Sequence, residues 1–367
     1  IISKIVHPDQ TCSVPGRDIR DGLSKIYNVI NYTDDQDIDG LLLSVDHMSA
    51  FDIIEWEYIY QVIDYFGLGE KFRKWIETIY KNHHVCAKLQ INGFVTESFK
   101  VSRGIRQGCP LSAILYVLVS ETVTNHIRNN SSIPGLVLLG KEYKICNYAD
   151  DTNFFLSNFE AVTEVFRTYS LFRTASGATL KPDKTKILML GCSKLILAVP
   201  KKYETYITPK IKIYGVIFNR KGPDENANME FIDDTLLKIK SRRMGKDISY
   251  IARSRIIDTF YLAKLWYSGP YLRLGPDALH KIDPTVGRFI WSPSTRVKLK
   301  IDKIKKPIQY GGFGHTDIRS KLEAMSLMYL VRIRTLKLDQ EPLFQFYYEK
   351  AKLLKPFTLK RSTLPVL

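Results

Sequence analysis

The sequence predicts an α+β fold, in which an antiparallel sheet carries helices on one side. Three observations lead to this prediction. Short apolar runs at 41–45, 152–156 and 186–190 have the length and composition of buried strands. Between these runs, apolar side chains recur at helical intervals near residues 56–63 and 111–128. Finally, Asn92-Gly93 separates two strand-like runs, and this dipeptide is the strongest short signal for an antiparallel hairpin.

The elements follow in order along the chain. The strand at 41–46 ends in an acid, and a helix begins near Trp56 and stops at Gly67. The pattern then predicts a helix over 70–82, a hairpin with arms 85–91 and 94–99, a helix over 111–128, a hairpin with arms 136–139 and 142–147, a strand over 152–156, a helix over 160–175 that ends at Gly177, and strands over 186–190 and 211–218. From about residue 230 onward the pattern is helical and basic.

Composition predicts a folded protein of two or three subdomains, because the 367 residues are 45% hydrophobic and 25% charged. The chain opens on Ile1 and closes on Leu367, and we expect it to be a piece of a longer protein. No apolar run approaches the ~20 residues of a membrane span, and no signal peptide is visible, so we expect a soluble protein without membrane contact. The five cysteines are scattered, which predicts reduced thiols in an intracellular compartment.

The positive charge is confined to the C-terminal part of the chain. Residues 1–200 carry a net charge of −1 and residues 201–367 a net charge of +17. Such an excess attracts a polyanion through counterion release. We predict a helix with apolar positions Ile232, Leu236 and Ile239, and basic residues that contact a phosphate backbone without reading its sequence. The basic positions are Lys238, Lys240, Arg242, Arg243 and Lys246, followed by Arg296, Lys298, Lys300, Lys303, Lys305 and Lys306. For Trp266, Tyr267 and Trp291, packing is favoured over contact with nucleic acid.

A group of acids provides the sharpest chemical signal. Tyr148-Ala149-Asp150-Asp151 lies between two strand-like runs, and Asp46 ends an earlier strand. Adjacent carboxylates repel each other, and a divalent cation is the usual means of neutralising them. Neighbouring strands could bring the three acids together to hold two Mg²⁺ ions. The alternative is a solvated Asp-Asp turn, and the residues by themselves leave both interpretations open.

A loop rich in small residues lies between the acids, at 102–112, and runs into a helix. Its glycines allow close approach of a ligand to the backbone, a helix start offers free amides to phosphate, and Arg103 and Arg106 add charge. The alternative is that Gly and Pro simply mark the start of the helix.

The order of these motifs resembles the successive blocks of a reverse transcriptase. The blocks are Asp46 with Ala50-Phe51-Asp52, Arg106-Gln107-Gly108-Cys109-Pro110-Leu111-Ser112, Tyr148-Ala149-Asp150-Asp151, the stretch 177–186, and Ile213-Tyr214-Gly215-Val216. Further stretches resemble the branch of non-LTR (long interspersed element) retrotransposons, namely Pro8-Asp9-Gln10-Thr11, Pro15-Gly16-Arg17 and Gly311-Gly312-Phe313-Gly314. The resemblance covers about residues 5–330, and it implies the right-hand polymerase fold, with an antiparallel-sheet palm, partial fingers and a helical thumb.

The resemblance implies the catalytic and metal-binding roles. Asp46 matches the first metal-binding acid, and Asp150 and Asp151 match the acid pair of the turn. The backbone carbonyl of His47 would face a metal ion, so that its imidazole need not act. Lys184 lies where the family has a lysine suited to protonating the departing pyrophosphate, although Lys181 and Lys186 compete for this role.

The resemblance also implies a nucleotide site. Phe51 matches the bulky side chain that excludes a 2′-hydroxyl and so favours deoxynucleotides, whereas without the resemblance an ordinary core aromatic is the better interpretation. Gln107 and Gly108 match the pair that lines the incoming nucleotide and the template base. Arg106 and Tyr148 complete the residues expected near the nucleotide.

The predicted organisation is partial fingers at 1–37, a catalytic palm at 38–220, a basic helical thumb at 228–330 and a C-terminal extension at 331–367. The implied activity is RNA-directed DNA polymerisation from deoxynucleoside triphosphates, with two Mg²⁺ ions, an RNA template and a DNA primer, in the nucleus or the cytoplasm. The nucleus is favoured. Three parts of the family are expected to lie outside this piece: the basic finger segment that precedes this region, an endonuclease, and a cysteine-histidine knuckle. The alternatives are a non-catalytic nucleic-acid-binding relic and an intron maturase. The template, the DNA site, the oligomeric state and the preference between Mg²⁺ and Mn²⁺ are not predicted.

Overall fold

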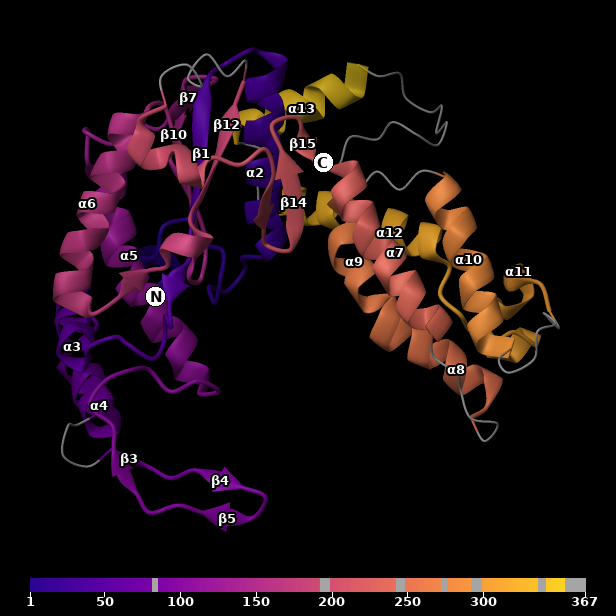
Figure 1. The fold of residues 1–367 in the computed structure, drawn as a ribbon, viewed down its shortest axis with the longest axis horizontal. Helices are drawn as coiled ribbons and strands as arrows, with labels where there is room; N and C mark the ends of the chain where they lie inside the picture. Colours follow the sequence, from indigo (N-terminus) through magenta and orange to yellow (C-terminus); the bar gives the residue numbers. More distant parts are fainter. Residues whose placement is uncertain are drawn as a thin grey trace. The chain divides into compact units, whose positions relative to one another are not determined.

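The computed structural model describes residues 1–80, 85–191, 199–241, 248–271, 276–291, 299–335 and 341–353. The chain divides into two compact units, Ile1–Tyr214 and Gly215–Leu367 (Figure 1). The first unit contains the predicted sheet and all the candidate site residues, whereas the second is mainly helical.

The helices of the first unit are α1 (Ile2–Ile5), α2 (Ile19–Asp35), α3 (Trp56–Tyr65), α4 (Glu70–Tyr80), α5 (Pro110–Asn129) and α6 (Phe159–Ser176). Its strands are β1 (Gly40–Val45), β2 (His47–Met48), β3 (Cys86–Ala87), β4 (Gln90–Ile91), β5 (Phe94–Val95), β6 (Phe99–Lys100), β7 (Leu136–Leu138), β8 (Lys141–Tyr143), β9 (Ile145–Tyr148), β10 (Asp151–Leu156), β11 (Thr179–Leu180), β12 (Lys186–Leu190) and β13 (Ile211–Ile213). Short 3-10 turns lie at Pro182–Lys184 and Lys201–Tyr206.

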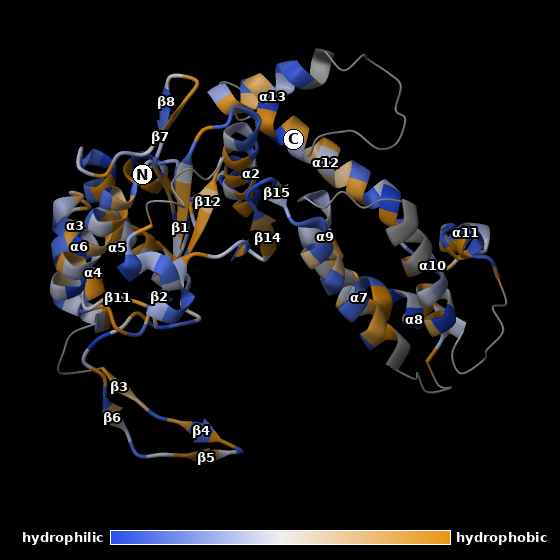
Figure 2. Cartoon of the chain, turned by 45° about the horizontal axis from the view of Figure 1, so that its top comes forward, coloured by the Kyte–Doolittle hydropathy of each residue, from blue (hydrophilic) through white to orange (hydrophobic). Residues whose placement is uncertain are grey.

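The central sheet has the strand order β12-β1-β10-β9, and each neighbouring pair is antiparallel. Strand β1 lies inside the sheet, with Leu43 opposite Phe154 on one side and Ile187 on the other. All three side chains are fully buried. Figure 2 shows the hydrophobic character of β1 and β12. The α+β class with an antiparallel sheet is therefore confirmed.

Helices cover both faces of this sheet, whereas the sequence predicted helices on one side only. Helices α3, α5 and α6 share one core with alternate residues of β1 and β10, such as Leu43 and Phe154. Helix α2 packs against β9 and β12 (Figure 1). At Gly22 of α2, an added Cβ would lie only 3.3 Å from the sulfur of Cys146. The physical reason is the unbroken apolar run of β1, because a strand that is apolar on both faces must be covered on both.

Capping fixes the helices close to their predicted bounds. Asn158 caps α6 by accepting the backbone N–H of Ala161 at 2.8 Å. Gly177 ends the same helix in the left-handed conformation, with φ +80°. A Cβ there would meet the carbonyl oxygen of Ile53 at 2.6 Å, so the predicted stop at Gly177 is confirmed and requires glycine. Helix α5 begins at Pro110, where the missing N–H costs nothing.

The hairpin predicted around Asn92-Gly93 is present, with φ values of +50° and +90° that suit a type I′ turn. Its arms are shorter than predicted, since only β3 to β6, of two residues each, are regular. The arms are exposed, so few side chains pack against them to hold a longer ladder. The strand predicted over 211–218 is also interrupted, because Tyr214 and Gly215 both have positive φ.

The second unit consists of β14 (Val216–Asn219), β15 (Gly222–Pro223), α7 (Glu225–Ser241), α8 (Tyr250–Ile256), a π-helical turn (Ile257–Tyr261), α9 (Ala263–Ser268), a 3-10 turn (Gly269–Tyr271), α10 (Pro276–Trp291), α11 (Ile301–Ile304), a second 3-10 turn (Ile308–Tyr310), α12 (Ile318–Thr335) and α13 (Pro342–Leu353). Leu236 and Ile239 of α7 lie in its core, as the helical pattern predicted. Trp291 is also buried there and Trp266 packs against it, which confirms the packing role of these two residues.

The predicted basic contacts of the second unit need one correction. Lys305 is not available to a phosphate backbone, because its ammonium pairs with Asp283 at 3.0 Å and with Asp317 at 2.8 Å. Its side chain is only 15% exposed. Of the other predicted basic residues, Arg242, Arg243, Lys246, Arg296 and Lys298 lie outside the described residues.

Two further predictions concerned membrane-spanning segments and the state of the cysteines. Within the described ranges, no helix combines the length and the apolar character that crossing a bilayer requires. Cys12, Cys86, Cys109 and Cys146 are free thiols, as predicted, and Cys192 lies outside the described residues.

Candidate functional site

Sheet topology places the three predicted carboxylates at one end of the central sheet. Asp46 follows β1, and Asp150 and Asp151 form the corner between β9 and β10. Val45 pairs with Thr152 across the antiparallel β1–β10 ladder. Asp46, the residue that follows β1, therefore emerges beside Asp151.

The corner that carries the acid pair is a tight turn. Tyr148 pairs with Asp151, which leaves Ala149 and Asp150 as a two-residue loop. Ala149 has a φ of +54°, in the left-handed region that costs an alanine roughly 1–2 kcal/mol. A conformation of this kind persists only where the surroundings hold it, and functional sites are where such strain concentrates.

The electrostatics of the site favour a bound cation. Burial and the charge of Asp46 raise the pKa of Asp150. Loss of solvation, together with the charges of Asp150 and Asp46, raises the pKa of Asp151 to about 6. The ammonium of Lys184 lies 2.5 Å from Oδ2 of Asp46, and this contact raises the pKa of the lysine. Three acids thus share the positive charge of one exposed lysine.

The donor set suits Mg²⁺, which prefers carboxylate oxygens. Within the described part of the chain, no three acidic, histidine or cysteine side chains are already gathered in metal-binding geometry. The ammonium of Lys184 contacts the Asp46 carboxylate instead. Burial first, and the neighbouring carboxylates second, disfavour the ionised forms of Asp150 and Asp151. The chemistry of the donor set, three neighbouring carboxylates, is therefore compatible with a divalent cation.

We predict that Asp151→Asn stabilises the metal-free protein by an amount that grows as pH rises. The pKa of Asp151 is about 6 in the folded protein against 3.8 for the free side chain, so the folded state binds its proton more tightly. Below about pH 4 the carboxyl is protonated in both states and the substitution changes little. Above about pH 6 it is ionised in the folded protein, and the free energy of unfolding is lowered by the full cost of its burial and of its repulsion by Asp150 and Asp46. Thermal unfolding in EDTA between about pH 4 and pH 8 measures the effect. A constant difference across that range would contradict the assignment.

Behind the carboxylates lies a cluster of aromatic rings. The imidazole of His47 is buried, which lowers its pKa to about 4, and its Nδ1 lies 3.1 Å from the hydroxyl of Tyr116. Phe51 stacks on Tyr116, with 4.7 Å between ring centroids and an angle of 26°. Phe51 is half-buried, so one part of its surface packs and another remains accessible.

The loop at 102–112 lies against the segment that carries Phe51. Ile105 donates its N–H to the Phe51 carbonyl at 2.6 Å. Gly104 has a φ of +91°, and a Cβ there would meet the carbonyl oxygen of Asp52 at 2.7 Å, so only glycine permits this approach. The side-chain amide of Gln107 donates to Asp52 at 2.9 Å. The structure thus brings the Phe51 and Gln107 blocks together.

The remaining predicted residues take separate positions. Arg106 is exposed, and its guanidinium lies 5.9 Å from the ring centroid of Tyr80, in α4. Gly108 follows with a φ of +81°. Tyr148 is half-buried, with its ring centroid 5.7 Å from that of Tyr214.

Gln10 and Tyr214, for which the sequence predicted no role, both contact the corner of the acid pair. The Gln10 side chain accepts the N–H of Ala149 at 3.1 Å. The Tyr214 hydroxyl lies 3.4 Å from the carbonyl oxygen of Asp151, within hydrogen-bond distance. Both residues lie in motifs that the sequence had singled out by resemblance, but only the fold shows that they meet at the turn.

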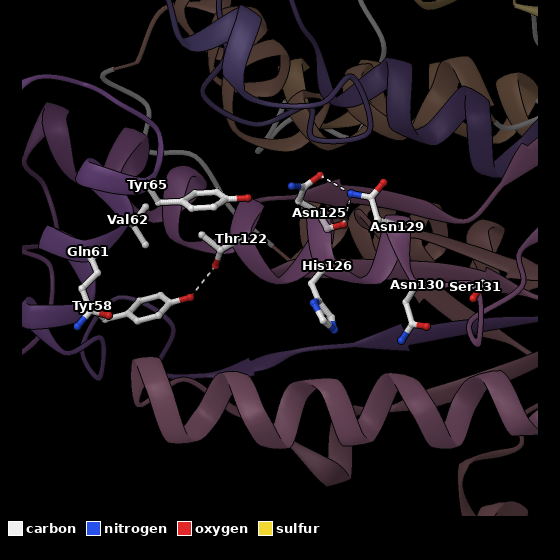
Figure 3. Close-up of a pocket in the computed structure, with 10 residues that line it drawn as sticks. All are labelled: Tyr58, Gln61, Val62, Tyr65, Thr122, Asn125, His126, Asn129, Asn130 and Ser131. Carbon is white, nitrogen blue, oxygen red and sulfur yellow. Dashed lines mark hydrogen bonds between the residues drawn. The ribbon is translucent and has the colours of Figure 1, made fainter.

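A groove of about 870 Å³ lies elsewhere in the first unit, between α3 and α5 (Figure 3). Its lining consists of Tyr58, Gln61, Val62, Tyr65, Thr122, Asn125, His126, Asn129, Asn130 and Ser131. The hydroxyl groups of Tyr58 and Thr122 are 2.8 Å apart, and the amides of Asn125 and Asn129 are hydrogen-bonded. Among these described lining residues there is no carboxylate, lysine or arginine.

Comparison with known proteins gives relatives for most of the chain. It is 25% identical over 337 residues to the "Transposon TX1 uncharacterized 149 kDa protein" of Xenopus laevis, which covers 90% of this chain and 25% of that protein. Among solved structures, telomerase of Candida tropicalis in complex with a fragment of telomeric RNA has a TM-score of 0.46 at 13% identity, covering 94% of this chain and 54% of that one. The corresponding telomerase of Candida albicans has a TM-score of 0.42 at 11% identity, covering 89% and 52%.

The chain thus spans about a quarter of the amphibian protein and about half of each telomerase. The amphibian relative is a transposon protein, in agreement with the predicted retrotransposon origin. The family model described as "Reverse transcriptase (RNA-dependent DNA polymerase)" matches residues 1–218, which is more than half of the chain and contains every candidate site residue. The predicted resemblance is therefore confirmed, and this chain belongs to the reverse transcriptase family.

Proposed function

We propose that this chain is the polymerase core of a non-LTR retrotransposon reverse transcriptase, which extends a DNA primer with deoxynucleoside triphosphates on an RNA template. The observation that carries the proposal is the convergence of Asp46, Asp150 and Asp151 at one end of the β1–β10 ladder, beside Lys184. Family membership supports the same activity.

In the reaction, the primer 3′-oxygen forms a bond to the α-phosphorus of the nucleotide while the bond from that phosphorus to the pyrophosphate oxygen breaks. Asp46, Asp150 and Asp151, with the carbonyl of His47, would hold two Mg²⁺ ions. Those ions would supply Lewis acidity, which lowers the pKa of the primer hydroxyl and stabilises charge on the pyrophosphate. The side chains form no covalent intermediate, because their part is to position the reactants and balance charge.

Lys184 would give its proton to the departing pyrophosphate. A lysine ammonium is protonated at neutral pH, and the side chain of Lys184 is 59% exposed, so it can turn from Asp46 toward a ligand. Lys181 and Lys186 are the neighbouring candidates, but Lys186 lies within β12, opposite Ser44.

Phe51, Gln107 and Gly108 would form the nucleotide site. The hydrogen bond between Gln107 and Asp52 holds the loop at 102–112 next to the Phe51 segment. The Phe51 ring, supported by Tyr116, would meet the sugar and exclude a 2′-hydroxyl. Arg106 and Tyr148 would complete the surroundings of the nucleotide and the primer end.

The proposed subdomains are partial fingers at 1–37, a palm at 38–220, a thumb at 228–330 and a C-terminal extension at 331–367. The excess of positive charge after residue 200 supports a duplex-binding thumb, although Lys305 is excluded from it. A retrotransposon enzyme of this kind would act on nuclear DNA, so we propose the nucleus as its site of action.

The deciding experiment is primer extension on a poly(rA)/oligo(dT) template with dTTP, in Mg²⁺ and in EDTA. We expect extension in Mg²⁺ only. Binding of the same duplex, followed by fluorescence anisotropy, is measured in parallel. Duplex binding without extension would contradict the proposed polymerase activity and favour a nucleic-acid-binding relic.

We further predict that Lys184→Ala slows extension about tenfold, below the ~10²–10⁴ that a general acid typically contributes. The reason is that Lys184 is exposed, so water and Lys181 can replace it as proton donors. Single-turnover rates measure the effect, and Lys184→Arg, which keeps the charge, should fall between the parent and the alanine variant. An alanine variant as fast as the parent would remove Lys184 from the mechanism.

A further inference from the structure

A short N-terminal segment extends the edge of the central sheet next to the acid pair. Strand β9 is the edge strand, and Gln10 forms a parallel bridge with its residue Asn147. The N–H of Asn147 donates to the Asp9 carbonyl at 2.9 Å, and the N–H of Thr11 donates back to the Asn147 carbonyl at 3.0 Å. The segment therefore lies along β9 up to the residue that precedes Tyr148.

The side chain of Gln10 reaches past this ladder into the corner. It is only 1% exposed, and its Oε1 accepts the backbone N–H groups of Cys12 at 3.0 Å and Ala149 at 3.1 Å. Both partners are donors, so the oxygen of the amide, and not its nitrogen, must face them. A neutral acceptor is thus placed on the one residue of the loop that has a positive φ.

Separate contacts hold the Gln10 segment itself in place. The guanidinium of Arg17 donates to the carbonyl oxygens of His7 at 2.6 Å and Gln10 at 2.7 Å. The carboxylate of Asp9 pairs with Lys25 at 2.5 Å and with Arg128 at 3.3 Å. Lys25 and Arg128 come from α2 and α5, so the segment is fixed to the helices on both faces of the sheet.

On the far side of the same corner lies Tyr214, whose single hydroxyl proton is shared between the carbonyl oxygens of Cys146 at 3.2 Å and Asp151 at 3.4 Å. The loop between Tyr148 and Asp151 is thus contacted from both sides. Without such contacts, an alanine in the left-handed region would relax at a gain of about 1–2 kcal/mol.

We propose that Gln10 is a positioning residue for the acid pair: by accepting the Ala149 N–H, it holds the turn in the conformation that presents Asp150 and Asp151 to divalent cations. This inference rests on the proposed metal-binding role of the two acids. Residues that orient metal ligands typically contribute about 10–100-fold in affinity or rate, because a ligand that must be ordered on binding binds more weakly.

The first test is Mn²⁺ binding, followed by the electron paramagnetic resonance signal of the free ion. Gln10→Leu, which keeps the volume but loses the acceptor, should weaken binding about 10–100-fold. The matched control is Thr11→Val, which removes the hydrogen bond from the Thr11 hydroxyl to the Asn147 carbonyl but leaves the corner untouched. It should bind Mn²⁺ within about twofold of the parent. Equal affinity in the Gln10→Leu variant and the parent protein would overturn the proposal.

A second measurement needs neither a variant nor polymerase activity. In the unchanged chain, hydrogen exchange of the Ala149 amide should be slowed at least about 100-fold relative to an unstructured peptide, because Gln10 shields it. Exchange at the unstructured rate would refute the contact even if the Gln10→Leu variant failed to fold. If the chain extends no primer but shows this protection and binds Mn²⁺, the proposed function fails while the positioning role stands.

Discussion

Asp150→Asn should reduce primer extension at least about 10³-fold, because an amide replaces a charged oxygen ligand where the two metal ions supply several kcal/mol of transition-state stabilisation. The same substitution should raise the melting temperature of the metal-free protein. Burial and the charge of Asp46 already raise the pKa of Asp150, so the ionised side chain is unfavourable in the folded state without a cation. Loss of activity combined with a gain in stability separates a ligand from a residue that only supports the fold.

The matched control for this prediction is Asp183→Asn. Asp183 is an exposed acid that precedes Lys184 in the same short 3-10 turn. Its substitution removes one negative charge near the site without touching a proposed ligand, so extension should remain within about threefold of the parent. If both variants lost activity equally, the loss would reflect the net negative charge near the site, and Asp150 would not be a specific metal ligand.

Phe51→Val should relax sugar selection about 100-fold, measured as the ratio of kcat/KM for dTTP to that for UTP. The Phe51 ring stacks on Tyr116 and lies in the segment hydrogen-bonded to the loop at 102–112, where the nucleotide is proposed to bind. Removing most of the ring opens space for a 2′-hydroxyl. The rate with dTTP should change less than the rate with UTP, because the deoxynucleotide needs no extra space.

The matched control removes a similar amount of aromatic packing at a residue that lies away from the proposed nucleotide site. Phe166 is also a half-buried aromatic, stacked on Tyr203 at 6.1 Å between centroids. Phe166→Val should lower stability comparably and leave the dTTP/UTP ratio unchanged. Unaltered selectivity in the Phe51→Val variant would show that Phe51 is an ordinary core aromatic.

Local sequence signals were sufficient for most elements of the sheet unit. Gly177 marks the end of α6 because no other residue fits its φ of +80° against the Ile53 carbonyl. Asn92-Gly93 specifies its hairpin for the same conformational reason. The predictions were wrong where element length or charge pairing depends on contacts between residues far apart in the sequence. The arms beside Asn92-Gly93 have no core to pack against, so their strands are shorter than predicted. The sequence predicts Lys305 as a cation available to phosphate, whereas in the fold it pairs with Asp283 and Asp317.

By itself, the sequence determined that Asp46, Asp150 and Asp151 end neighbouring strand-like runs, and the order of its motifs identified the reverse transcriptase family. These properties are local, since they depend on residue type, spacing and short-range conformation. Only the tertiary structure decided that α2 covers the second face of the sheet, that Lys184 pairs with Asp46, and that Gln10 supports a turn 139 residues away. Such contacts are set by which surfaces are buried together, and no local pattern carries that information.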